Sequence, residues 1–203
     1  MPPLSELAIL ILAAGRGTRM GRASHPKLLL PWRDGKSILW HTIQSALSLG
    51  PREVVVVVRP DLPEMVEALG DLPVRCVPNP RYEEGMGTSL AVGIGAVSGN
   101  AEAALLMLGD EPDVPRHVVE RLIAAYQSEG KSITIPLYGK HVGPPTIFAR
   151  RIFPELMRLE GDMGARSLIA RHPDWTCMIP FDEADRPHDI DTQEDYQVVI
   201  PDP

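Results

Sequence analysis

Three continuous apolar runs stand out along the chain, at residues 7–13, 54–58 and 103–108. Apolar runs of this length without polar alternation predict strands that are buried on both faces, as in a parallel sheet. Weaker strand patterns lie at residues 74–78, 132–136 and 175–179.

Helical patterns lie between these runs, at residues 37–49, 61–69, 88–97, 115–127, 150–159, 164–171 and 193–199. Ser37 is a good N-cap, and Pro115 suits a first helical turn. The alternation predicts an α/β fold with a mostly parallel sheet and helices on both faces, in a single domain that spans residues 1–203. Ligands bind at the carboxyl ends of the strands in such folds, so a site is expected directly after the apolar runs.

The charge of the chain argues against a nucleic-acid surface. Its 203 residues include 20 Lys and Arg and 27 Asp and Glu, for a formal net charge of −7, and no basic block is present. Nucleic-acid binding requires clustered cations that neutralise many phosphates. A local basic site for a small phosphate ligand remains open.

The cysteines and the N-terminal segment indicate a cytoplasmic protein. Cys76 and Cys177 belong to no spaced metal motif and are predicted to be free, buried thiols in a reducing compartment. The apolar stretch at residues 7–14 is too short for a membrane span and lacks the flanks of a signal peptide. We therefore expect no membrane partner.

The loop after the first apolar run carries candidate nucleotide contacts. They are Ala13, Ala14, Gly15, Arg16, Gly17, Thr18 and Arg19, followed by Lys27. Glycines allow the backbone to approach a ligand, and exposed N–H groups with two or three cations suit a triphosphate. Arg19 could bind phosphate oxygens with two donors and Lys27 as a point charge. An ordinary Gly-rich turn with solvated arginines is the alternative.

Two common nucleotide motifs are excluded in this loop. A P-loop needs G-x4-G-K-[ST], which does not occur here, and a dinucleotide fingerprint needs Gly where Met20 stands.

The string A-A-G-x-x-x-R-M-G at residues 13–21, followed by Lys27 and Leu-Leu-Leu-Pro, resembles the signature loop of the molybdenum cofactor nucleotidyltransferases. These belong to the MobA-like NTP transferase group of the GT-A-like fold, and the match is closest to the cytidylyltransferase branch. Further motifs in order are Asn79-Pro80, G-M-G-T-S-L at 85–90, G-D-E-P at 109–112, G-D-M-G-A-R at 161–166 and D-I-D-T-x-E-D-Y at 189–196. The resemblance covers roughly residues 7–197.

The resemblance implies a three-layer α/β/α fold and a Mg²⁺-dependent nucleotidyltransferase. Lys27 and Arg19 would hold the triphosphate, while Asp110 and Asp191 would bind the metal. Asp110 follows a buried apolar run, where a carboxylate is costly without a partner, and Mg²⁺ typically takes one or two carboxylates. Asp110 could instead cap the helix near Pro115. Spacing alone does not choose between Asp189 and Asp191, and the family pattern favours Asp191.

The chemistry that the resemblance implies needs little covalent work from the protein. The acceptor phosphate attacks the α-phosphorus in line and pyrophosphate leaves, so catalysis is positioning and charge neutralisation. No general base is required, because a phosphate nucleophile is already ionised near neutral pH.

The same resemblance assigns the base of the nucleotide to Asn79, Gly85, Met86 and Ser89. A-A-G in the first loop is typical of CTP users, whereas G-G at positions 14 and 15 is typical of GTP users. We expect CTP, and a physical hypothesis is that the methyl group of Ala14 narrows the room for a purine. A Gly-rich helix entry with Ser89 in the first turn is the alternative reading.

The acceptor side is assigned to Gly143, Pro144, Asp162 and Arg166, with molybdopterin as the acceptor and a molybdoenzyme or its chaperone as a transient partner. Two positions depart from the family pattern. Gly17 stands where Ser is usual, and Pro144 where His is usual. Arg166 could hold an anionic phosphate or be a solvated helix charge.

Two other functions fit the motifs. One is another transferase of the same fold, which uses GTP or accepts phospholactate or a sugar phosphate. The other is a nucleotide- or cofactor-binding chaperone that delivers the molybdenum cofactor without turnover.

Overall fold

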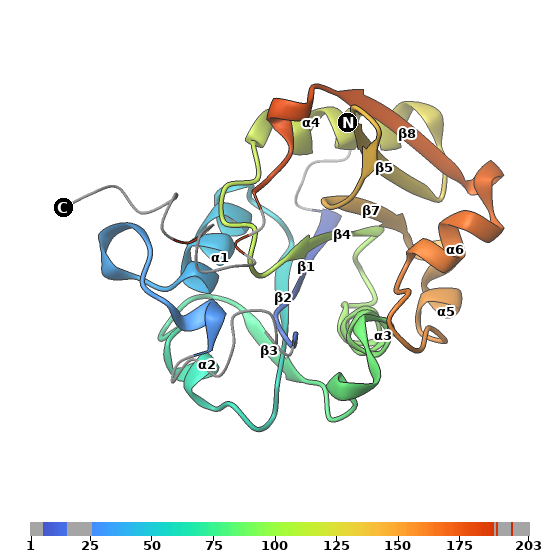
Figure 1. Cartoon of the computed structure of the whole chain (residues 1–203). Coiled ribbons are helices and arrows are strands. Elements are labelled where there is room, and N and C mark those ends of the chain that lie inside the picture. Colours follow the sequence, from blue (N-terminus) through green and yellow to red (C-terminus); the bar gives the residue numbers. More distant parts are fainter. Residues whose placement is uncertain (1–5, 16–25, 189, 191–195, 197–203) are drawn as a thin grey trace.

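The computed structural model describes residues 6–15, 26–188, 190 and 196. Its core is an eight-stranded mixed sheet with the order β3-β2-β1-β4-β7-β5-β6, in which β8 pairs with β5 (Figure 1). The strands are β1 Leu7–Leu12, β2 Glu53–Val58, β3 Arg75–Pro78, β4 Ala103–Leu108, β5 Ile133–Tyr138, β6 His141–Val142, β7 Thr146–Ala149 and β8 Thr176–Phe181.

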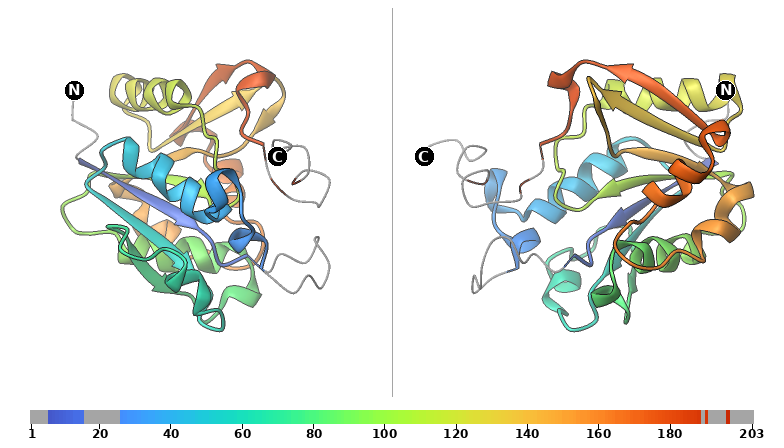
Figure 2. Two further views of the ribbon diagram at one scale, coloured as in Figure 1. Left: turned by 90° about the vertical axis from the view of Figure 1, so that its left-hand side faces the viewer. Right: turned by 45° about the vertical axis from the view of Figure 1, so that its right-hand side comes forward.

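Helices cover both faces of the sheet (Figure 1, Figure 2). They are α1 Ile38–Ser48, α2 Glu64–Glu67, α3 Met86–Ala96, α4 Arg116–Glu129, α5 Phe153–Leu156 and α6 Arg166–Arg171. Short 3₁₀ turns include Lys27–Leu29 and Tyr82–Glu84. The predicted three-layer α/β/α fold is confirmed.

The two apolar cores follow from the alternation of side chains along the strands. In β1, Ile9 and Ile11 face the core shared with α1, α2 and α4. Ala8 and Leu10 face the core shared with α3, α5 and α6. A strand between two helical layers therefore needs apolar residues at every position, which is why its sequence reads as a continuous apolar run.

The strands β1, β2, β3 and β4 are parallel, while β7 runs antiparallel to both β4 and β5. The sequence did not predict β6 or β7. The four residues of β7 follow Pro144-Pro145 and are too few to give a period, although they lie fully buried beside β4.

Three predicted helices are shorter than expected. Residues 61–69 contain only α2, since Pro63 disfavours a helical conformation in the residue before it and α2 begins directly after it. Residues 150–159 form a 3₁₀ turn and then α5, and residues 164–171 form only α6, because Gly164 has a positive φ of 49°. The helix predicted at 193–199 lies outside the described residues.

The cysteines are free, as predicted, but they are only partly buried. Cys76 lies on β3 and Cys177 on β8, which are the outermost strands on their sides of the sheet. An outer strand is covered on fewer sides, so the prediction of fully buried thiols is wrong.

Close packing of α3 on the sheet gives a test of the core. A Cβ atom at Gly93 would overlap the Leu10 side chain and lie 2.9 Å from Val57 Cγ2, whereas one at Gly95 would meet only Met157 Sδ, at 3.6 Å. We expect Gly93→Ala to lower the free energy of unfolding by about 1–3 kcal/mol through overpacking. Gly95→Ala, the matched control, should raise it by up to about 1 kcal/mol through helix propensity. Urea denaturation measures both, and equal effects would contradict this packing argument.

Candidate active site

The candidate site lies where β1 and β4 end side by side. The two strands are parallel, with Leu12 opposite Leu108. The ladder continues one step further, since Gly109 N donates to Leu12 O over 2.9 Å. The next residue is Asp110, so its carboxylate leaves the sheet at the same edge as the Gly-rich loop that follows Ala13. This is the edge at which the sequence predicted a ligand.

Lys27 and Asp110 form an ion pair at this edge. Lys27 Nζ donates to Asp110 Oδ2 over 2.7 Å, and the two side chains are 9% and 23% exposed. Lys27 begins the 3₁₀ turn Lys27–Leu29, whose Leu28 and Leu29 pack against the core under α1. Apolar anchoring of this turn therefore holds the predicted triphosphate cation beside the predicted metal ligand.

The backbone around Asp110 is fixed from two sides. Thr42 Oγ1 on α1 donates to Gly109 O over 2.9 Å. The packing at Gly109 is tight, because a Cβ atom there would lie 3.2 Å from Leu12 O and 3.3 Å from Leu28 Cδ1. The alternative role of Asp110 as a helix cap is wrong, since α4 begins after Pro115 without a side-chain cap.

The C-terminal segment returns to the same place. Ile190 N donates to Asp110 O over 3.4 Å, and Ile190 is buried with Trp32 and Ile38. The hydroxyl of Tyr196 donates to Pro31 O. The first of these contacts places Ile190, one residue of the D-I-D-T motif, beside Asp110.

Several predicted site residues lie outside the described residues. They are Arg16, Gly17, Thr18 and Arg19 in the first loop, and Asp189 and Asp191 near the C-terminus. Ala13 and Ala14 are buried and Gly15 is exposed at the end of β1.

Asn79 holds the start of α3 in place. Its side chain is fully buried, and Nδ2 donates to Thr88 Oγ1 and Ser89 Oγ, both over 3.0 Å. Its Oδ1 accepts from Arg81 N over 2.9 Å. The polar atoms of this amide are therefore occupied by protein groups, and the geometry makes Asn79 a positioning residue for the predicted base-binding turn.

The predicted nucleotide and acceptor motifs interlock. Gly87 N donates to Gly161 O over 2.8 Å. A Cβ atom at Gly87 would lie 2.8 Å from Glu160 O, and one at Gly85, where φ is 118°, would lie 2.5 Å from Asp162 Oδ1. Only glycine permits this approach, so the turn before α3 and the turn before α6 form one unit.

Side chains reinforce this contact and leave two thioethers at the surface. Arg81 Nη2 lies 3.4 Å from Glu160 Oε1. A Cβ atom at Gly164 would meet Met86 Sδ at 3.5 Å. Met86 and Met163 are both exposed large apolar side chains.

The remaining acceptor candidates lie near this edge or on the surface. Because Thr146 of β7 is opposite Leu106 of β4, Gly143 and Pro144 lie on the side where β4 ends. The buried hydroxyl of Tyr138 donates to Pro144 O over 3.3 Å, and burial raises the pKa of that hydroxyl. Asp162 and Arg166 are exposed, with Arg166 at the start of α6.

Sequence reasoning missed a cluster after β2. Arg59 Nε and Nη2 bind the two carboxylate oxygens of Asp61 at 3.1 and 2.7 Å, and the Tyr82 hydroxyl donates to Asp61 Oδ2 over 3.1 Å. The Arg59 hydrogen bonds lower the pKa of Asp61 to about 2. Arg59 directly follows the apolar run of β2, which was the available signal. The cluster ties the end of β2 to the 3₁₀ turn that leads into Gly85.

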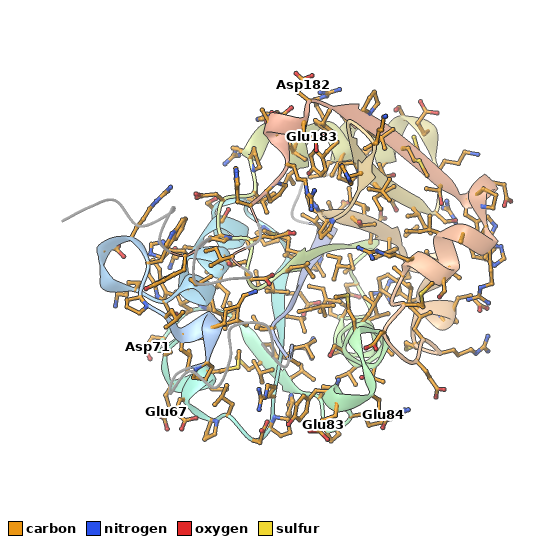
Figure 3. The ribbon with its side chains drawn as sticks, viewed as in Figure 1. Glu67, Asp71, Glu83, Glu84, Asp182 and Glu183 are labelled. Carbon is orange, nitrogen blue, oxygen red and sulfur yellow. The ribbon has the colours of Figure 1, made fainter. Side chains whose placement is uncertain are left out.

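Acidic side chains lie at two opposite ends of the molecule in Figure 3. Glu67, Asp71, Glu83 and Glu84 lie around α2 and before α3, and Asp182 and Glu183 lie after β8. A triphosphate meeting this net negative protein needs local cations, and Lys27 supplies one at the site.

The described residues fit a divalent cation in part. Within them, no group of three or more His, Cys, Asp or Glu side chains could hold a metal ion. Asp110 is nevertheless a hard oxygen donor, and the Lys27 ammonium beside it shows that the position accommodates positive charge. Mg²⁺ needs only one or two carboxylates when phosphate oxygens and water complete its shell.

No helix in the described part of the chain has the length and apolar character of a membrane span.

The fold and the residues at this edge define the nucleotidyltransferase class of the GT-A-like fold. Residues 9–175 match the MobA-like NTP transferase domain, and the chain belongs to this family.

The comparisons with individual proteins agree with this family. The solved structure of Rv0371c from Mycobacterium tuberculosis H37Rv is 31% identical, covers 98% of this chain and 99% of its own, and has a TM-score of 0.82. A complex of Rv0371c with manganese is 28% identical over 96% of this chain and 97% of its own, with a TM-score of 0.78.

Among curated proteins, the bifunctional protein GlmU of Leifsonia xyli subsp. xyli is 34% identical over 132 residues, which are 64% of this chain and 27% of that protein. The chain therefore spans less than a third of the length of this relative.

Asn79 offers a test of the positioning role. We expect Asn79→Ala to lower the free energy of unfolding by about 1–3 kcal/mol, because buried partners on α3 and at Arg81 lose their hydrogen bonds. It should also raise the KM for the nucleoside triphosphate with a smaller effect on kcat. The exposed Asn100→Ala is the control. Wild-type stability and KM in Asn79→Ala would contradict the role.

Proposed function

We propose that this protein transfers CMP from CTP to the phosphate of molybdopterin and releases pyrophosphate. The observation that carries the proposal is the Lys27–Asp110 pair, because it brings a phosphate-binding cation and a metal-binding carboxylate within 2.7 Å at the carboxyl edge of the sheet. Family membership supports the transfer of a nucleotide, while the choice of CTP and of the acceptor rests on the motifs.

Lys27 binds the triphosphate in this proposal, together with Arg19 from the first loop. Asp110 and Asp191 hold a divalent cation, which supplies neutralisation of the charge on the phosphates. The manganese complex of Rv0371c supports a divalent metal. The protein's own part is to fix these groups in advance, since preorganised charges need no reorganisation during the reaction.

The turn at Gly85 and Met86, held by Asn79, offers backbone groups to the base. CTP is favoured by the A-A-G motif alone. The methyl group of Ala14 is buried among the core residues under α3, so the structure gives no support to a direct steric action of that methyl on a purine.

The acceptor binds on the other side of the interlocked turns. Asp162 and Arg166 are exposed there, and Arg166 is available for an anionic phosphate. Gly143 and Pro144 flank the end of β4. Proline lacks a side-chain donor, so in this proposal Pro144 meets the acceptor through its ring and backbone and not through an imidazole.

Turnover with labelled nucleotides tests the proposal. With Mg²⁺ and molybdopterin, we expect pyrophosphate release from CTP to exceed that from GTP by about tenfold or more, as a site that hydrogen-bonds one base rejects another. Parallel reactions with the other nucleoside triphosphates and with sugar phosphates or phospholactate give the controls. A preference for GTP would overturn the base assignment. Binding of CTP and Mg²⁺ with no pyrophosphate from any acceptor would instead favour a chaperone.

Asp110 has a matched control on the same segment. We expect Asp110→Asn to lower kcat by about 100-fold or more, because one preorganised charge at the phosphates is lost. Asp113→Asn should keep the wild-type rate, since Asp113 is an exposed carboxylate that pairs only with Arg33 among the contacts described here. Circular dichroism and thermal unfolding check that both variants fold. A folded Asp110→Asn with a near-normal rate would disprove the assignment.

A further inference from the structure

The two groups that the proposed function separates are bound to each other in this structure. Lys27 is assigned to the triphosphate and Asp110 to the metal, yet Lys27 Nζ lies 2.7 Å from Asp110 Oδ2. An ammonium at this distance occupies the approach of a second cation to that oxygen. The lysine therefore competes for the ligand that the metal needs.

We infer that the Lys27–Asp110 pair is a closed form of the site, in which the lysine ammonium takes the place of the metal. The divalent cation and the nucleoside triphosphate then bind cooperatively, and each binds poorly alone. This inference rests on the proposed function and adds the order and coupling of ligand binding at the same site.

The mobility of the two partners is unequal. The backbone at Asp110 is held through Gly109 O by Thr42 and through its own carbonyl oxygen by Ile190. Lys27 reaches Asp110 on a flexible four-carbon stem. Opening of the pair therefore needs rotation of one side chain and leaves the carboxylate in place.

The cost of opening depends on what replaces each partner. Both side chains are largely shielded from water, so a metal alone would have to displace the ammonium from Asp110 with no phosphate to receive it. A triphosphate alone would take the ammonium and leave the carboxylate without its cation. When both ligands are present, Lys27 exchanges Asp110 for the phosphates and Asp110 exchanges Lys27 for the metal. Each exchange makes the other more favourable.

Linkage sets the size of the effect. If the pair is closed for about 90–99% of the time, the apparent affinity of the free protein for a metal is about 10–100-fold below that of the open site. The same factor must appear in both directions, since coupling between two ligands is reciprocal.

The test measures metal binding without turnover. Mn²⁺, whose free form is followed by electron paramagnetic resonance, is titrated into nucleotide-free protein. We expect Lys27→Met to bind Mn²⁺ about 10–100-fold more tightly than the wild type. Lys36→Met, which removes an exposed lysine, is the matched control and should bind as the wild type does. The double variant Lys27→Met with Asp110→Asn should lose the increase in Mn²⁺ affinity that is expected for Lys27→Met.

A second measurement does not depend on Lys27 variants. A CTP analogue with a methylene bridge between its α- and β-phosphates is titrated by calorimetry in the presence of a chelator. Asp110→Asn should bind the analogue more tightly than the wild type does, because the carboxylate no longer competes with the phosphates for Lys27. With Mn²⁺ present, the wild type should bind the analogue more tightly than Asp110→Asn does.

Opposite results separate the two proposals. If Lys27→Met folds and gains no Mn²⁺ affinity, the closed form is disproved. If Lys27→Met does not fold, the closed form is disproved when Asp110→Asn gains no affinity for the analogue in the absence of metal. In either case, turnover by the wild type leaves the proposed function intact. If the wild type binds no Mn²⁺ even with the analogue and releases no pyrophosphate, the proposed function itself fails.

Discussion

A carboxylate at the end of a strand buried between two helical layers must have a positive neighbour or remain in water, and the arrangement around Asp110 follows from this constraint. β4 is apolar along its whole length, so the first polar side chain after it emerges at the rim of the core. The cation that pairs with it, Lys27, comes from a segment 83 residues away in sequence. That distance is bridged because β1 and β4 are adjacent and parallel, which brings the loop after one strand to the end of the other.

The positions of the remaining groups depend on backbone approach rather than on long side chains. Gly109 admits Leu28 and the end of β1, and Gly87 admits the carbonyl oxygens of residues 160 and 161. A side chain at Gly87 would push two segments apart, and one at Gly109 would be tightly packed. The glycines of the motifs therefore act in this fold as points of close contact, and not only as flexible joints. The turn before α3 and the turn before α6, which we assign to the nucleotide and the acceptor, share such a contact.

Much of the fold could be predicted from the sequence, because strands between two layers have an unmistakable apolar pattern. All six predicted strands are present, and residues 103–108 match β4 to the residue. β7 could not be predicted, since four residues after two prolines have no period, and its place beside β4 is set by tertiary packing. Helix ends were overestimated where Pro63 and Gly164 set the backbone. The motifs also led to the Lys27–Asp110 pair, but the part of Asn79 depends on hydrogen bonds that no spacing reveals, and Arg59 was overlooked although it follows β2 directly.

The residues of the proposed site differ in how firmly the surrounding protein holds them. On the side that we assign to the nucleotide, the backbone at Asp110 and the amide of Asn79 are each held by groups that are buried, so their positions are set before any ligand arrives. On the side that we assign to the acceptor, Asp162, Met163 and Arg166 are exposed, and their side chains can change without disturbing the core. A family with this construction can keep the chemistry of nucleotide transfer while the acceptor varies. Pro144, also assigned to that side, is held differently, because the buried hydroxyl of Tyr138 donates to its carbonyl oxygen and so helps to fix the shape of the turn.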